Sequence, residues 1–188
     1  MHTFTPEQRK KKKKRFMESQ NAKKLEWLRT VEKIIGLAVV IFLLFQFVVG
    51  YSVITGDSME GTLHAGDVVF YTRLFNPCER DDIVVFAEPD GDFVVKRIVA
   101  VAGDLIDIRD GVFYVNGIAE SRENVIGPTI GENLALTYPM RVPEGSVFIM
   151  GDNRPGSVDS RMYGMIKISS VSATLHLRCG WLFFDWLP

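Results

Sequence analysis

The chain has 188 residues, of which 47% are hydrophobic and 24% charged, and its formal net charge is −1 at pH 7. That length allows one catalytic domain of about 130 residues with an independent core, plus short appendages. With two cysteines, three histidines and no CxxC or HExxH spacing, the sequence argues against a metal site, and we expect no cofactor.

The first 33 residues are strongly basic, although the chain as a whole is nearly neutral. They contain eleven Lys or Arg and four Glu, which gives this segment a charge of +7. Such a run is compatible with a nucleic-acid arm, a solvated tail or a signal that sets membrane topology. The segment that follows it decides between these interpretations.

Residues 34–54 predict a transmembrane anchor helix, because no charged residue occurs between Ile34 and Gly56. A run of about 20 apolar residues is long enough to cross a bilayer. A buried core helix and a cleaved secretory signal are the alternatives, but the basic block disfavours the first and the lack of a small-x-small cleavage site disfavours the second. The basic residues place 1–33 in the cytoplasm and residues 55–188 outside the cell membrane, with no nucleic-acid partner.

After this segment the pattern changes to short runs of β-branched and aromatic residues separated by Gly, Pro, Asn and Asp, which predicts a mainly antiparallel β domain. Asp90-Gly91, Asp110-Gly111 and Asn116-Gly117 are typical hairpin turns. The segment 120–144 is polar and rich in Pro and Gly, so we expect a long excursion there. The strands are expected within 68–75, 82–89, 92–103, 105–117 and 146–154.

Two further features leave alternatives open. The aromatic carboxyl-terminal segment 181–187 suits either a membrane interface or a terminal strand packed in the core. A disulfide between Cys78 and Cys179 is permitted by an extracytoplasmic compartment, but the sequence does not establish the geometry that a disulfide requires. The oligomeric state is also open.

The chemistry centres on Ser58, in the segment Gly56-Asp57-Ser58-Met59, and on Lys96, in an apolar predicted strand. A serine hydroxyl needs a base to take its proton, and an ammonium cannot be that base. Burial disfavours the charged form of lysine and can lower its pKa by several units. These two segments therefore predict a Ser-Lys catalytic dyad.

Four segments in order resemble the bacterial type I signal peptidases: TGDSMEGTL, GDVVFY, DDIVVF with VKRIVAVAGD, and IMGDNRPGSVDSRMYG. The last is the most specific, and the resemblance covers nearly all of the chain beyond residue 55. It implies the antiparallel β fold shared by signal peptidases and LexA-like self-cleaving repressors. It also implies a membrane-anchored serine endopeptidase that releases exported preproteins by cutting their signal peptides after Ala-x-Ala.

The same resemblance assigns roles to individual residues. Ser58 becomes the nucleophile that forms an acyl-enzyme, and Lys96 the general base. Ser157 helps to orient the lysine, Asp159 and Arg161 form a supporting ion pair, and Met59 packs beneath the nucleophile. The backbone N–H of Ser58 contributes to the oxyanion hole, whose second donor is undefined because Gly56 stands where some relatives have serine. The pockets for small substrate side chains use Ile54, Leu63 and Val95.

The chain departs from the family pattern at two positions. Gly61 stands where the family usually has proline, and Asp81 stands where it usually has glycine. His64 is read as a loop histidine, because Lys96 fills the base position.

Two other functions are alternatives to a signal peptidase. A self-cleaving repressor would need a DNA-binding domain for which 1–33 is too short. A scaffolding protein on a decayed peptidase fold would lack the serine or the lysine.

Overall fold

The computed structural model describes residues 6–73, 78–87, 92–131, 136–180 and 184–187. The chain divides into two compact units, residues 1–47 and 48–188. The second unit is the β domain.

The first unit is the single helix α1 (Pro6–Phe47). Its uncharged part begins at Ile34, and the large apolar side chains from there to Phe47 are exposed on all sides of the helix. No helix within the described residues is both long and apolar enough to cross a membrane.

The predicted anchor helix over 34–54 is wrong at its carboxyl-terminal end. The helix ends at Phe47, and Val49–Val53 form strand β1, which pairs antiparallel with β2 (Val68–Thr72). The local sequence explains the change, because β-branched and aromatic residues favour strands and Gly50 disfavours helix. The uncharged part of α1 therefore extends over only ~21 Å at the helical rise of 1.5 Å per residue.

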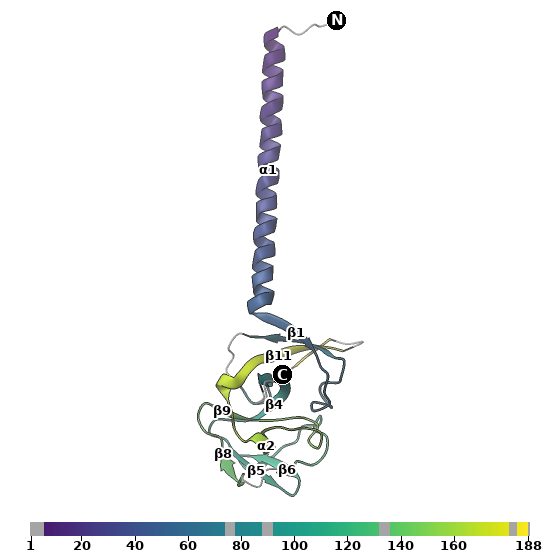
Figure 1. Ribbon diagram of the computed structural model, residues 1–188, viewed down its shortest axis with the longest axis vertical. Helices are drawn as coiled ribbons and strands as arrows, with labels where there is room; N and C mark the ends of the chain where they lie inside the picture. The colour runs from purple at the N-terminus through teal and green to yellow at the C-terminus, as the bar shows by residue number, and fades with distance from the viewer. Residues whose placement is uncertain (1–5, 74–77, 88–91, 132–135, 181–183, 188) are drawn as a thin grey trace. The chain divides into compact units, whose positions relative to one another are not determined.

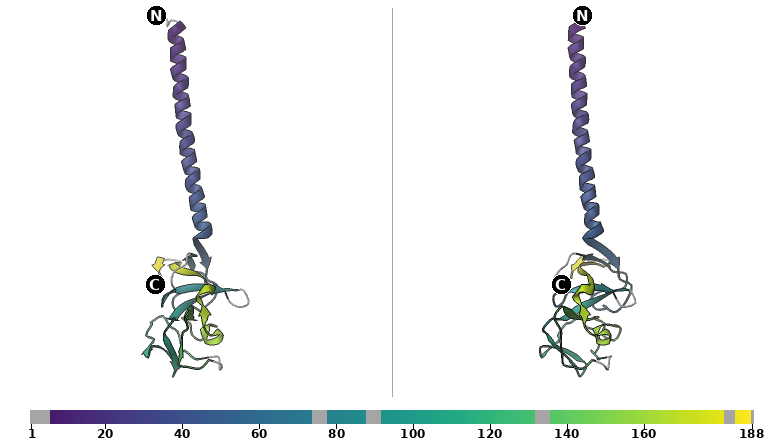
Figure 2. Two further views of the ribbon diagram at one scale, coloured as in Figure 1. Left: turned by 90° about the vertical axis from the view of Figure 1, so that its left-hand side faces the viewer. Right: turned by 60° about the vertical axis from the view of Figure 1, so that its left-hand side comes forward.

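The β domain is mainly antiparallel β structure, as the sequence pattern predicts, and its described residues form two sheets (Figure 1). The larger sheet has the order β1-β2-β11-β3-β4-β9-β10, with β12 paired to β11. The smaller has the order β7-β6-β5-β8. The views of Figure 2 show the smaller sheet and the larger sheet at opposite ends of this domain. The remaining strands are β3 (Ile83–Ala87), β4 (Phe93–Val101), β5 (Leu105–Arg109), β6 (Val112–Val115), β7 (Ile118–Ala119), β8 (Met140–Arg141), β9 (Ser146–Met150), β10 (Ile166–Lys167), β11 (Val171–Cys179) and β12 (Phe184–Trp186).

The hairpin turns on either side of β6 are confirmed. Asp110 and Gly111 both have positive φ, as do Asn116 and Gly117, which is the backbone conformation of a type I′ turn. The third predicted turn, Asp90-Gly91, lies outside the described residues. The excursion 120–144 contains the two-residue strand β8 among its described residues, and Val142 packs into the core.

The carboxyl-terminal segment shows features of both proposed interpretations. Strand β12 pairs with β11, and Leu187 packs against a buried cluster of the β domain, whereas Trp186 is 82% exposed.

The two cysteines are free thiols, so the Cys78–Cys179 disulfide is not formed. Burial and the neighbouring Asp82 carboxylate raise the pKa of the Cys78 thiol, which keeps it protonated and weakly nucleophilic.

The core lies on both faces of the larger sheet and between the sheets. One cluster packs on the face from which Val69, Ile83 and Leu175 project, and it includes Met59 and Leu63 from the turn after β1. The turn that carries Ser58 is thus fixed to the sheet by two buried neighbours of the serine. Two other clusters surround Phe148 and Ile149 of β9.

Candidate active site

Ser58 lies in a tight turn between β1 and β2. The N–H of Glu60 donates to the carbonyl of Asp57 at 2.9 Å, and the N–H groups of Thr62 and Leu63 both donate to the carbonyl of Met59. Met59 and Leu63 are 2% and 0% exposed, while Ser58 itself is half-buried. The turn therefore buries the residues around the serine and leaves its hydroxyl at the surface of the core.

Lys96 lies on β4 and is 3% exposed. Its Nζ donates a hydrogen bond to Oγ of Ser58 at 2.8 Å. The structure thus brings together two side chains that are 38 residues apart in the sequence. A buried amine at hydrogen-bond distance from a hydroxyl has the geometry of a base and its nucleophile.

The segment after β9 closes around the backbone of Ser58. The N–H of Asn153 donates to the carbonyl of Ser58 at 3.1 Å, and its side-chain amide donates to the carbonyl of Asp57. A Cβ atom added at Gly151 would lie 2.4 Å from the carbonyl oxygen of Ser58 and 2.3 Å from Oγ of Ser157. Glycine is therefore required at 151, and Ser157 is a near neighbour of Ser58.

Asp159 and Arg161 form the ion pair that the sequence predicts, and they are 1% exposed each. Two N–H groups of the Arg161 guanidinium donate to the Asp159 carboxylate at 2.9 Å, and Asp159 also caps the short helix α2 (Ser160–Tyr163). The same carboxylate accepts hydrogen bonds from the N–H of Gly151 and the hydroxyl of Ser157. Asp159 thus holds Gly151 and Ser157, two residues beside the Ser58 turn. Burial and the Asp159 charge raise the pKa of nearby Tyr138 to about 12.

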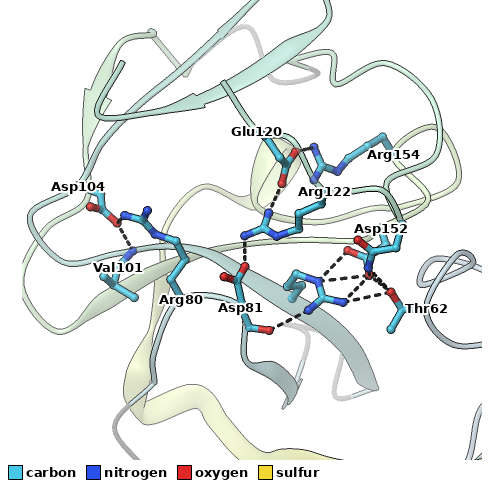
Figure 3. A network of polar contacts seen from close by, with 11 residues as sticks. Thr62, Arg80, Asp81, Val101, Asp104, Glu120, Arg122, Asp152 and Arg154 are labelled. Atoms are coloured by element: carbon cyan, nitrogen blue, oxygen red, sulfur yellow. Dashed lines mark hydrogen bonds and ion pairs between the residues drawn. The ribbon is translucent and has the colours of Figure 1, made fainter. Parts of the chain in front are cut away.

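A second buried ion pair, which sequence reasoning missed, joins Arg97 to Asp152, and Asp152 is labelled in Figure 3. These residues are 3% and 0% exposed, and Arg97 directly follows Lys96. The hydroxyl of Thr62 donates to Asp152 at 2.5 Å, and the side chain of Asn124 donates to both Thr62 and Asp152. The pair therefore links the strand of Lys96 to the turn of Ser58. The sequence contains a signal for this pair, because Arg97 lies in the segment VKRIVAVAGD and Asp152 in IMGDNRPGSVDSRMYG, two of the segments that resemble the family.

The polar contacts continue beyond this pair, as Figure 3 also shows. Arg97 donates to the carbonyl of Asp81, whose side chain forms an ion pair with Arg122. Glu120 accepts from both Arg122 and the fully buried Arg154. The excursion that begins at 120 is in this way fixed to the segment after β9.

Gly61 has φ +100°, and a Cβ atom there would lie 2.2 Å from the carbonyl oxygen of Asn124. Proline is confined to φ near −65°, so the residue usual in the family would not fit this turn. Asp81 also has positive φ. His64 is exposed in a turn beside Glu60 and Asp67, as expected for a loop histidine.

A groove of about 440 Å³ runs over the face of the larger sheet that carries the Ser58 turn. Val95, the neighbour of Lys96, lines it, whereas Ile54 and Leu63 belong to the buried cluster beside it. Val95, Val85 and Ala173 form the floor of the groove. They lie side by side on three neighbouring strands, because Val95 pairs with Val85 and Val85 with Ala173. The lining consists of Ser52, Val69, Tyr71, Arg73, Val85, Phe93, Val95, Ser172 and Ala173.

The buried Asp159–Arg161 pair generates a stability prediction. Asp159→Ala should lower the free energy of unfolding by about 3–5 kcal/mol, because it leaves the Arg161 charge buried without its carboxylate. Asp107→Ala is the matched control, since Asp107 pairs with Arg109 at a partly exposed site and should cost no more than about 1 kcal/mol. Urea unfolding monitored by circular dichroism measures both, and similar losses in the two variants would contradict the assignment.

Comparison with known proteins shows the family to which the chain belongs. Residues 25–181 match the family model described as signal peptidase, peptidase S26. The chain is 35% identical over 166 residues to signal peptidase I of Bacillus licheniformis, covering 79% of this chain and 84% of that one. It is 33% identical over 156 residues to signal peptidase I S of Bacillus subtilis, covering 77% and 84%.

A crystal structure of a signal peptidase I from Enterococcus faecalis is also similar, with 34% identity and a TM-score of 0.46, covering 54% of this chain and 98% of that one. The family match extends over most of the chain, and the relatives are covered over more than two thirds of their length. The chain belongs to the signal peptidase family S26 and is a hydrolase of that family.

Proposed function

We propose that this chain is a serine endopeptidase that removes signal peptides from exported preproteins, with Ser58 as nucleophile and Lys96 as general base. The contact of 2.8 Å between the buried Lys96 amine and the Ser58 hydroxyl is the observation that carries this proposal. The family to which the chain belongs supports the substrate class.

The proposed reaction follows from the positions of these two groups. With Lys96 neutral, the Ser58 hydroxyl donates its proton to Nζ as Oγ attacks the scissile carbonyl. The protonated amine then returns the proton to the leaving amine, which leaves the substrate's acyl group on Ser58. Lys96 next takes a proton from water and the hydroxide formed attacks the ester carbonyl. The protonated amine then returns the proton to Oγ of Ser58 as the signal peptide leaves. Burial of Lys96 at 3% exposure supports this step, because desolvation disfavours the ammonium.

The groove beside Val95 supports the proposed substrate recognition. Val95, the sequence neighbour of Lys96, lines it together with Val69 and Val85, so we propose that an extended peptide lies on this aliphatic floor with its cleavage site at Ser58. Recognition of this kind uses backbone hydrogen bonds for affinity and side-chain pockets for specificity. We propose that the residues one and three before the cut are small, as in Ala-x-Ala. Ile54 and Leu63 act from beneath, by fixing the wall that the substrate contacts.

We further propose that α1 attaches the enzyme to the cell membrane. The exposed apolar side chains from Ile34 to Phe47 support attachment, and the basic residues before them suit an anionic lipid surface. The cytoplasmic location of 1–33 and the extracytoplasmic location of the β domain are part of the same proposal.

The dyad is tested by replacing each member. Ser58→Ala and Lys96→Met should each lower kcat for an Ala-x-Ala peptide by at least about 10⁴-fold, the order found when a nucleophile or its base is removed. Lys167→Met is the control, since Lys167 is exposed on β10 and should retain full activity. Thermal unfolding checks that each variant is folded. A folded variant of Ser58 or Lys96 with undiminished activity would refute the dyad.

The oxyanion hole is tested at Gly56, where an added Cβ atom would have no heavy atom within 4 Å. Gly56→Ser should raise kcat by about tenfold or more, because one additional oxyanion donor is worth up to about 10²–10³-fold. Gly56→Ala adds the same Cβ without the hydroxyl and should change kcat less than twofold. Equal kcat values for the two variants would show that position 56 does not face the oxyanion.

Membrane attachment is tested by flotation of the full chain with lipid vesicles, followed by carbonate extraction. We expect the chain to float with anionic vesicles, and we expect Ile41→Lys combined with Leu44→Lys to reduce flotation by placing charge in the apolar segment. Replacing Lys10 to Lys14 with Gln is the control for electrostatic binding alone. Protease protection of the amino-terminal segment reports the orientation. A wild-type chain that stays with the soluble fraction would contradict attachment.

A further inference from the structure

The groove beside Lys96 carries one charged side chain among the described residues that line it, and that side chain is Arg73. The rest of the lining is aliphatic, aromatic or hydroxyl-bearing. Arg73 therefore gives an otherwise uncharged peptide site a fixed positive charge.

Arg73 directly follows β2 and continues the face of that strand. Alternate residues of a strand point to one face, so Val69, Tyr71 and Arg73 line the groove together. Arg73 is also tied to the strand pairing, because its backbone N–H donates to the carbonyl of Val48 at 2.8 Å. The register of β1 and β2 thus fixes where the charge lies.

The guanidinium of Arg73 is held over the groove by its neighbours. It lies 5.2 Å from the centre of the Tyr71 ring, and one amino group donates to the Tyr71 hydroxyl at 3.3 Å. The other amino group donates to the carbonyl of Val49 at 3.2 Å. These contacts involve two of the five N–H groups of a guanidinium, which retains donors for a carboxylate acceptor.

We propose that Arg73 is a specificity-determining residue that favours substrates with an Asp or Glu several residues before the cleavage site. This inference rests on the proposed function, because it requires that the groove hold the peptide. A strand rises about 3.3 Å per residue, so Arg73 lies ~13 Å beyond Val69 along β2. We therefore place the acidic residue beyond the pockets proposed for the residues one and three before the cut, at about four or more positions before it. An exposed pair of this kind is worth about a 1.5- to 5-fold change in kcat/KM.

The test uses peptides with one Ala-x-Ala cleavage site and a single Asp, Asn or Lys at each position from four to eight before the cut. We expect the wild-type enzyme to prefer Asp over Asn about 1.5- to 5-fold at one or two adjacent positions, and to cut the Lys peptide there more slowly. Raising the salt concentration should weaken this preference.

Substitutions of Arg73 test whether this side chain is the source of the preference for Asp. Arg73→Gln should abolish it and Arg73→Glu should reverse it in favour of Lys. Arg141→Gln is the matched control, because Arg141 lies on β8 of the other sheet, is also exposed and also donates from an amino group to a backbone carbonyl, that of Gly103. It should leave the preference unchanged.

The outcomes separate this inference from the proposed function. Cleavage of every peptide at the same rate would overturn the role of Arg73 and leave the peptidase intact, whereas no cleavage of any peptide would contradict the proposed function itself. A uniform loss of activity in Arg73→Gln would show that Arg73 supports the fold and does not select substrate. The assay is repeated with anionic lipid vesicles present. If Arg73→Gln then loses activity equally on all peptides, and only in the presence of the vesicles, Arg73 contacts the lipid surface and the inference is overturned.

Discussion

The hydrogen bond of 2.8 Å between Lys96 and Ser58 joins a strand to a turn that the sequence separates by 38 residues. Buried polar groups of the β domain hold these two segments in place. The Arg97–Asp152 pair fixes the strand to the segment after β9, and Asn153 binds the carbonyl of Ser58. The segment 151–161 therefore helps to hold the Ser58 turn and the Lys96 strand together, although it contributes neither side chain of the Lys96–Ser58 hydrogen bond.

The charges of that segment are neutralised locally. Asp152 pairs with Arg97 and Asp159 with Arg161, and all four side chains are at most 3% exposed. Buried pairs add little net stability compared with apolar side chains, but removal of one partner is costly. In this domain the two carboxylates fix the positions of the loops around Ser58. Asp152 accepts hydrogen bonds from the Thr62 hydroxyl and the Asn124 amide. Asp159 accepts them from the Ser157 hydroxyl and the backbone N–H of Gly151.

The sequence predicted the strands whose side chains alternate clearly or are β-branched throughout, together with the hairpins at Asp110-Gly111 and Asn116-Gly117. It missed β11, a central strand of the larger sheet, although apolar Val171, Ala173 and Leu175 alternate there with polar residues. It extended the anchor helix too far, because hydropathy alone does not distinguish an apolar helix from the apolar edge strand that follows it.

The site was predictable where the motifs are specific, and not where contacts depend on the tertiary arrangement. Ser58, Lys96 and the Asp159–Arg161 pair all come from recognised segments. Asn124 does not, because its hydrogen bonds to Thr62 and Asp152 exist only once the excursion packs beside the Ser58 turn. Nor could the pattern show that Leu63 is fully buried while Val95 lines the groove.

We propose that Oγ of Ser58 carries the substrate's acyl group during the reaction. Mass spectrometry of the acid-quenched reaction with an Ala-x-Ala peptide ester tests it most directly. The account predicts a mass increase equal to the acyl part of the substrate, confined to the proteolytic fragment that contains Ser58 and lost in Lys96→Met. Cleavage that proceeds with the acyl group on another residue would contradict the account.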